Sequence, residues 1–200
     1  MRNYTGAIED FTKTIERAPD VVAYINRGSA KTKLKDYRGT IADLSLALEL
    51  DPENTAVYIS RGNAKLKLKD ITGALDDYTN VIVLSPEKSD AYIKRGDIQL
   101  TLKDYGSAIA DFSKAIEINS EDAVIFYKRG LAKAKLEDYK GAVMDYTESI
   151  MLDATYTYGY SERGIAKENM EDFEGACEDW RKAADLGHYA SAQWVKDSCN

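Results

Sequence analysis

Residues 58–70 read YISRGNAKLKLKD, and the main features of this stretch return at a fixed spacing through the 200-residue chain. An Arg-Gly pair recurs every 34 residues, with an aromatic residue four positions before each glycine and an aspartate eight positions after it. The pairs are Arg27-Gly28, Arg61-Gly62, Arg95-Gly96, Arg129-Gly130 and Arg163-Gly164. The aromatic residues are Tyr24, Tyr58, Tyr92, Phe126 and Tyr160, and the aspartates are Asp36, Asp70, Asp104, Asp138 and Asp172. A strict period of this length predicts a protein built from repeated structural units.

The second half of each period also carries recognisable landmarks. In residues 55–88, Ala74, Tyr78 and Pro86 follow one another, with Val81 where a second alanine is expected. This pattern resembles the tetratricopeptide repeat (TPR) family, whose second helix carries alanine, an aromatic residue, alanine and then proline. The resemblance covers nearly the whole chain and implies an all-α, right-handed superhelical solenoid of helix pairs. The family's aromatic residue three positions after the glycine is replaced here, at Lys31, Lys65, Gln99, Lys133 and Lys167.

We expect one TPR solenoid over residues 1–200. Five full repeats should span 21–54, 55–88, 89–122, 123–156 and 157–188, between the second helix of a partial repeat at 1–20 and a capping helix at 189–200. Within 55–88, the first helix should run from about Ala56 to Lys69. The second should begin near Thr72 and stop before Ser85-Pro86, because proline cannot continue a helix. The partial repeat should leave an apolar face at 7–18, open to an upstream helix, a partner or self-association with a second copy.

The first helix of each repeat should present one face away from its partner helix. A helix advances by about 100° per residue, which places Ile59, Asn63 and Leu66 on that outer face. In TPR proteins this face lines the concave groove where ligands lie. Apolar residues that recur at an exposed position indicate an interaction site, although neighbouring repeats partly covering them is an alternative explanation. The predicted partner-binding groove consists of Ile25, Ser29, Ile59, Asn63, Leu66, Ile93, Asp97, Leu100, Tyr127, Leu131 and Tyr158.

The recurring arginines have two interpretations, an anion-binding stripe or a structural ladder. A matching aspartate recurs in the second helices, at Asp10, Asp43, Asp77, Asp111, Asp145 and Asp179. We expect each arginine to pair with one of these aspartates, because a partly buried arginine needs a carboxylate partner. Replacing Arg95 with alanine should therefore reduce stability and leave ligand affinity almost unchanged.

Two cysteines, Cys177 and Cys199, lie near the C-terminus. The stretch GACEDW at 175–180 resembles the last repeat of bacterial TPR proteins, which often carry a second cysteine after the capping helix. The resemblance implies a disulfide between the two, which would add about 3 kcal/mol of stability. Two free thiols are the alternative. A bridge would indicate an oxidising compartment, so we expect the bacterial periplasm or cell envelope with a bridge and an upstream leader, and the cytoplasm otherwise.

Composition argues against several classes of function. A net charge of −7 with dispersed lysines disfavours nucleic-acid binding, and there is no apolar run long enough to span a membrane. The single histidine, His188, should be a surface or capping residue. With no metal-ligand cluster and no glycine-rich phosphate loop, we expect no cofactor, no metal site and no enzyme activity.

The sequence therefore favours a protein-interaction scaffold that binds a peptide or partner protein of unknown identity in the concave groove. The alternative is a structural spacer or assembly subunit that contacts partners through its ends or convex face. A third hypothesis is that the solenoid regulates an enzyme domain outside the printed sequence.

Overall fold

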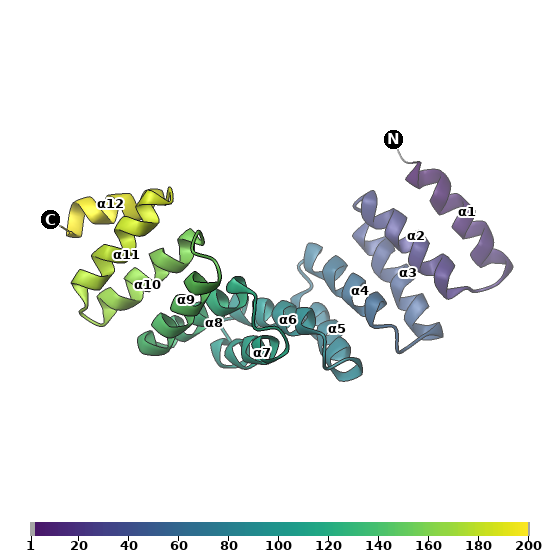
Figure 1. Ribbon diagram of the computed structural model, residues 1–200. Helices are drawn as coiled ribbons and strands as arrows, with labels where there is room; N and C mark the ends of the chain where they lie inside the picture. The colour runs from purple at the N-terminus through teal and green to yellow at the C-terminus, as the bar shows by residue number, and fades with distance from the viewer. Residues whose placement is uncertain (1–2, 200) are drawn as a thin grey trace. The chain divides into compact units, whose positions relative to one another are not determined.

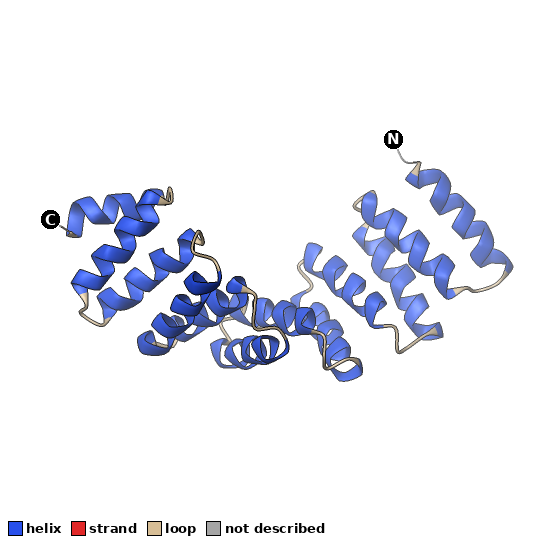
Figure 2. Cartoon of the chain, in the orientation of Figure 1, coloured by secondary structure: helices blue, strands red, loops and turns tan. Residues whose placement is uncertain are grey.

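The computed structural model describes residues 3–199, in which every regular element is an α-helix (Figures 1 and 2). This confirms the prediction of an all-α repeat fold. The helices are α1 (Tyr4–Arg17), α2 (Val21–Lys33), α3 (Tyr37–Leu50), α4 (Thr55–Lys67), α5 (Ile71–Leu84), α6 (Ser89–Thr101), α7 (Tyr105–Ile118), α8 (Ala123–Lys135), α9 (Tyr139–Leu152), α10 (Thr157–Asn169), α11 (Phe173–Asp185) and α12 (Tyr189–Ser198).

The helices fall into two compact units, one up to Ala91 and one from Tyr92 onward. In the first unit, α1 to α5 pack in chain order, each against the next. In the second, α7 to α12 pack in the same way. The first helices α2, α4, α6, α8 and α10 begin at intervals of 34 residues, and α12 packs against α11 after the last pair.

The aspartate of each period begins the second helix. Asp70 caps α5, because its side chain accepts a hydrogen bond of 3.0 Å from the backbone N–H of Gly73. The residue before it, Lys69, has a left-handed backbone with φ of 62°. A left-handed residue ends a helix. This explains why α4 stops at Lys67, two residues before the end at Lys69 that the sequence predicted. The same conformation recurs at Lys35, Lys103, Glu137 and Glu171.

The glycine of each period lets the two helices of a pair approach closely. A Cβ atom at Gly130 would lie 2.7 Å from the ring of Tyr146, too close for any real contact. Tyr146 itself is completely buried. Gly96 against Phe112 and Gly164 against Trp180 repeat this arrangement. In four of the five full pairs, an aromatic ring of the second helix therefore packs on the glycine of the first helix, and in the pair of α2 and α3, Leu44 takes this place against Gly28.

Across residues 3–199, none of the helices combines the length and the apolar character that crossing a membrane requires.

Candidate functional site

The residues predicted to form the groove all keep part of their surface open, and none of them is buried. In the first unit, Ser29 and Asn63 are exposed, and the other members are half-buried. In the second unit, Tyr158 is 55% exposed, whereas Tyr127 and its remaining neighbours in the set are half-buried. The half-buried members of the first unit are Ile25, Ile59 and Leu66, and those of the second are Ile93, Asp97, Leu100, Tyr127 and Leu131.

Part of that burial comes from packing within the solenoid. Ile25 packs against the core cluster of Tyr24 and Leu44. Tyr127 and Leu131 pack against the cluster that contains Tyr146. These side chains therefore support the core with one side and leave the other side open for contact.

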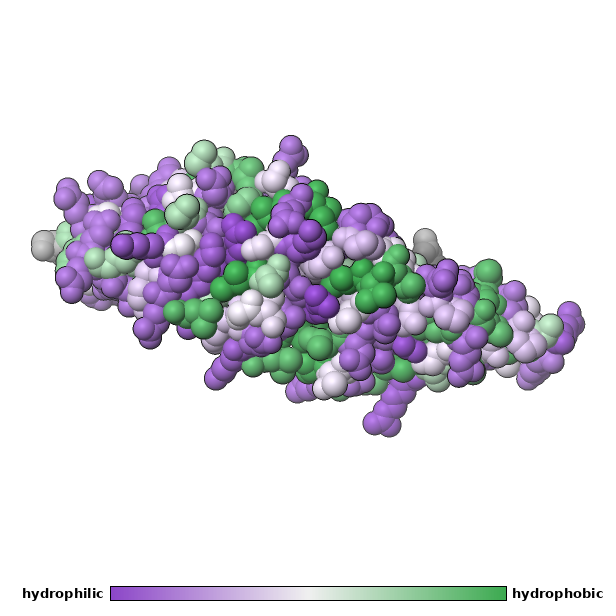
Figure 3. Space-filling view, turned by 90° about the horizontal axis from the view of Figure 1, so that it is seen from below, coloured by the Kyte–Doolittle hydropathy of each residue, from purple (hydrophilic) through white to green (hydrophobic). Residues whose placement is uncertain are grey.

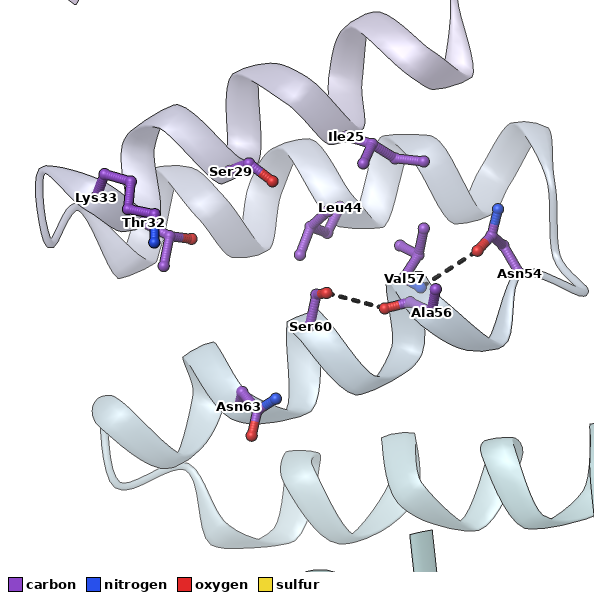
Figure 4. Close-up of a pocket in the computed structure, with 10 residues that line it drawn as sticks. All are labelled: Ile25, Ser29, Thr32, Lys33, Leu44, Asn54, Ala56, Val57, Ser60 and Asn63. Carbon is purple, nitrogen blue, oxygen red and sulfur yellow. Dashed lines mark hydrogen bonds between the residues drawn. The ribbon is translucent and has the colours of Figure 1, made fainter. Parts of the chain in front are cut away.

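A hollow of about 310 Å³ lies on this face of the first unit, between α2 and α4 (Figure 4). Ile25 and Val57 supply apolar walls, while the hydroxyl of Ser60 is held by the backbone carbonyl of Ala56 at 2.9 Å. The lining residues are Ile25, Ser29, Thr32, Lys33, Leu44, Asn54, Ala56, Val57, Ser60 and Asn63. Three residues of the predicted groove, Ile25, Ser29 and Asn63, thus line one hollow. Its lining mixes apolar side chains with small polar groups and one lysine, Lys33.

In the second unit, the same face carries a chain of aromatic rings. The ring of Tyr127 lies 5.2 Å from that of Tyr156 and 6.4 Å from that of Tyr158. Tyr158 in turn lies 5.7 Å from the ring of His188. We call Tyr127, Tyr156, Tyr158 and His188 the tyrosine cluster. These centroid distances and tilted or edge-to-face angles are those of favourable aromatic contacts.

Glu162 lies one helical turn after Tyr158, on the same face of α10. Its side chain is half-buried and makes no hydrogen bond or ion pair with any residue between 3 and 199. Burial raises the pKa of its carboxyl, while the positive charge of Lys135 and the nearby His188 oppose that effect. Its negative charge also adds to the effect of burial in raising the pKa of the Tyr127 hydroxyl.

The neighbouring hydroxyl of Tyr146 is also unsatisfied. It is buried and has no hydrogen-bond partner in the described part of the chain. The corresponding Tyr78 donates to the side-chain oxygen of Asn63 at 2.8 Å. Two repeats after Asn63, the equivalent residue is Leu131. Its side chain has no oxygen that could accept a hydrogen bond from Tyr146. The Glu162 carboxyl and the Tyr146 hydroxyl are thus two polar groups that have no hydrogen-bond partner in the described part of the chain.

The recurring arginines form the predicted ladder with the second-helix aspartates. Arg61 reaches the buried carboxylate of Asp77 through Nη2 at 2.7 Å, in a two-pronged contact that also uses Nε. The guanidinium lies over the ring of Tyr58, 5.5 Å from its centroid. The equivalent pairs are Arg27–Asp43, Arg95–Asp111, Arg129–Asp145 and Arg163–Asp179. This confirms that the arginines are structural groups engaged inside each repeat.

The ladder also explains the departure from the TPR pattern. Lys65 stands where the family has an aromatic residue, and its Nζ lies 2.9 Å from the other oxygen of Asp77. Lys31, Lys133 and Lys167 contact their aspartates in the same way. Two cations thus share each buried carboxylate, which offsets the cost of removing it from water. The third repeat differs, because Gln99 replaces the lysine and its buried Oε1 has no partner within residues 3–199.

The C-terminal cap joins the last repeat through two sets of contacts. The structure links Cys177 of α11 to Cys199 by a disulfide, with the Cα atoms 5.6 Å apart. His188 caps α12, because its Nδ1 accepts a hydrogen bond from the backbone N–H of Ser191 at 3.3 Å. Trp194 of α12 lies 5.5 Å, ring to ring, from Trp180 of α11.

Sequence reasoning missed three parts of these sites: Tyr156, Glu162 and the lysines of the ladder. Tyr156 precedes α10 and falls outside the helical face from which the groove was predicted. No other repeat has an acid at the position of Glu162. The equivalent residues of the earlier repeats are Asn26, Ser60, Lys94 and Lys128. The sequence contained a signal for Tyr156, the tyrosines at 156, 158 and 160, and one for Glu162, the change from a neutral or basic residue to an acid.

Comparisons with known proteins agree with the repeat and the fold. Tetratricopeptide repeat models match residues 21–54 and 59–123. No curated protein sequence matches the chain at a significant level. Among solved structures, YrrB, a TPR protein described as having an unusual peptide-binding site, matches with a TM-score of 0.82 and 23% identity over 95% of this chain and 99% of its own.

Two further solved structures show the same fold. MamA from Desulfovibrio magneticus RS-1 gives a TM-score of 0.78 at 19% identity, over 83% of this chain and 94% of its own. The C-terminal part of a TPR repeat-containing protein from Cytophaga hutchinsonii gives 0.81 at 20% identity, over 96% and 77%. The chain thus contains tetratricopeptide repeats at residues 21–54 and 59–123, and its fold is that of solved TPR solenoids.

Proposed function

We propose that this chain is a protein-interaction scaffold that holds a peptide or partner protein against the exposed face of its first helices. The hollow between α2 and α4 carries the proposal, because residues predicted for the groove line it and leave it open. The peptide-binding site of YrrB, which shares the fold, gives further support.

The chemistry of that face suits a peptide better than a reacting substrate. The arginines and lysines of the ladder are engaged by buried aspartates, so they do not form an anion-binding stripe. The rest of this face is a mixture of half-buried apolar side chains, small hydroxyls and amides with a few charged groups, such as Lys33 and Asp97. Such surfaces bind extended or helical segments through many weak contacts.

Affinity capture from native lysate, read by mass spectrometry, tests this proposal. Ser29→Arg with Ser60→Arg should fill the hollow without unfolding the chain, because both side chains are exposed. The matched control is Ala42→Arg with Thr72→Arg, which places the same charges at exposed positions of the second helices α3 and α5. Circular dichroism checks that both variants fold.

We expect specific partners of the wild type to bind the control and to be lost from the first-helix variant. Partners that bind all three proteins equally would contradict binding at the first helices. Partners lost only from the control would instead place the interaction on the second helices.

A second function remains as an alternative, because large apolar side chains are exposed on the second helices. Val83 of α5 is 73% exposed, and Met144 and Met151 of α9 are 70% and 72% exposed. On the face drawn in Figure 3, apolar residues form separate patches among hydrophilic ones. Such side chains could join the solenoid to an assembly through the second helices. Met144→Gln with Met151→Gln tests this alternative, since it should remove partners only if the second helices bind them.

A further inference from the structure

The tyrosine cluster leaves aromatic surface open beside an acid, Glu162, that has no hydrogen-bond or ion-pair partner between residues 3 and 199. Tyr158 is 55% exposed, and its ring is linked through Tyr127 and Tyr156 into one continuous group of aromatic contacts. Glu162 follows Tyr158 on the same side of α10, and α10 contacts α8, which carries Tyr127. A half-buried carboxylate therefore lies at the edge of a set of aromatic rings.

Among residues 3–199, no cation forms an ion pair with that carboxylate. Lys135 and His188 are near enough to influence Glu162, but neither forms an ion pair with it in the described part of the chain. A partly desolvated charge without a partner reduces stability. The buried acids of this unit, Asp111, Asp145 and Asp179, each contact an arginine, and the last two also contact a lysine. Glu162 is thus an exception in a protein that otherwise pairs its buried charges.

The aromatic rings and the carboxylate of Glu162 together favour a positively charged ligand. The faces of aromatic rings attract cations, and the attraction grows where water is partly excluded. A carboxylate adds a charge-assisted hydrogen bond to an ammonium or guanidinium group. The surrounding repeat at 157–188 strengthens this preference, because it holds eight acidic and four basic side chains. An acidic segment would be repelled here.

We propose that the tyrosine cluster and Glu162 bind the lysine or arginine side chain of a partner peptide. The proposal rests on the proposed function, because the peptide must lie along the first-helix face for its side chain to reach this position. The basic side chain would extend over the ring of Tyr158, and its charged end would meet Glu162. The negative charge of Glu162 is thus the reason that the bound side chain should be a lysine or an arginine.

A random 12-residue peptide display library, selected on the wild type, tests the proposal. Parallel selections use Glu162→Gln, which removes the charge and keeps the shape, and Glu178→Gln, which makes the same change at an exposed position on α11. We expect the wild type and Glu178→Gln to enrich peptides with lysine or arginine at one fixed position. Glu162→Gln should lose that preference.

A double-mutant cycle then measures the contact itself. The most enriched peptide is compared with a version in which norleucine replaces its lysine, or citrulline its arginine. Calorimetry should show roughly tenfold weaker binding when either charge is removed, and little further loss when both are. Tyr158→Ala should weaken binding by roughly two- to fivefold.

The outcomes separate this proposal from the function on which it rests. Enriched peptides without a basic residue, bound equally by wild type and Glu162→Gln, would overturn the assignment of a basic ligand and leave the scaffold function standing. Additive losses in the cycle would also overturn it, because they would show that Glu162 and the basic residue do not meet. Failure of the folded wild type to enrich any peptide would overturn this proposal and would restrict the proposed function to binding a partner protein.

Discussion

The third repeat offers a sharp test of the arginine ladder, because its aspartate depends on fewer cations than the others. Asp111 is 5% exposed, and within residues 3–199 the one cation within 4.0 Å of it is Arg95, whose Nη2 lies 2.7 Å away. The hydrogen bond with Asp111 raises the pKa of Arg95 against the opposing effect of burial. Asp77, in contrast, keeps Lys65 at 2.9 Å if Arg61 is removed.

The two arginines should therefore differ in their contribution to stability. Arg95→Ala leaves a buried carboxylate without a cation, which costs about 3–5 kcal/mol. Arg61→Ala removes a charge-assisted pair of hydrogen bonds but leaves Lys65 in place, which costs about 2 kcal/mol. Lys114→Ala is the control, because it removes an exposed ion pair with Glu117 and should change the stability least of the three.

Urea unfolding followed by circular dichroism at constant pH measures these differences. The order of loss should be Arg95→Ala, then Arg61→Ala, then Lys114→Ala. The folded Arg95→Ala protein should also keep the affinity of the wild type for its partners. A loss below about 1 kcal/mol for Arg95→Ala, or a larger loss for Arg61→Ala, would refute the reasoning.

Three further predictions concern Gln99, Glu162 and the disulfide. Gln99→Lys should raise the free energy of unfolding by about 1 kcal/mol, because it removes an unsatisfied buried amide oxygen and gives Asp111 a second cation, as in the other repeats; no gain in urea unfolding would contradict this. Burial raises the pKa of Glu162 in the folded state, so the contribution of Glu162 to stability falls as pH rises above the unfolded value of about 4.3. Glu162→Gln should therefore be more stable than the wild type at pH 7 but not at pH 3, and an equal difference at both would argue against a desolvated carboxylate. The disulfide closes a separation of 22 residues, so reduction should cost the wild type about 3 kcal/mol. Cys199→Ser should show no response to reductant, and free thiols in the oxidised wild type would rule out the bridge.

Most of the fold could be predicted from the repeat period, because each recurring residue reflects a separate physical constraint. Gly62 must be small for Tyr78 to approach, Asp70 must accept a hydrogen bond to start α5, and Pro86 must follow the end of that helix. Each constraint is local, so it could be predicted from the residues of one period. The pairing of Arg61 with Asp77 followed from the same register.

The sites were harder to predict because they depend on neighbouring repeats. The contacts of Tyr156 with Tyr127 join residues 29 positions apart, and no single helical face contains both. Lys65 was recognised as a departure from the family pattern, but its role required the position of Asp77 on the facing helix. The missing partner of Glu162 could be seen only once the cations around it had been placed.

The affinity of one captured partner for three proteins tests the central claim most directly. Calorimetry would give the dissociation constant for the wild type, for Ser29→Arg with Ser60→Arg, and for Ala42→Arg with Thr72→Arg. Binding at the first-helix face predicts at least a tenfold weaker affinity for the first variant, about 1.4 kcal/mol, and an unchanged affinity for the second. Equal affinities for the wild type and the first-helix variant would contradict it.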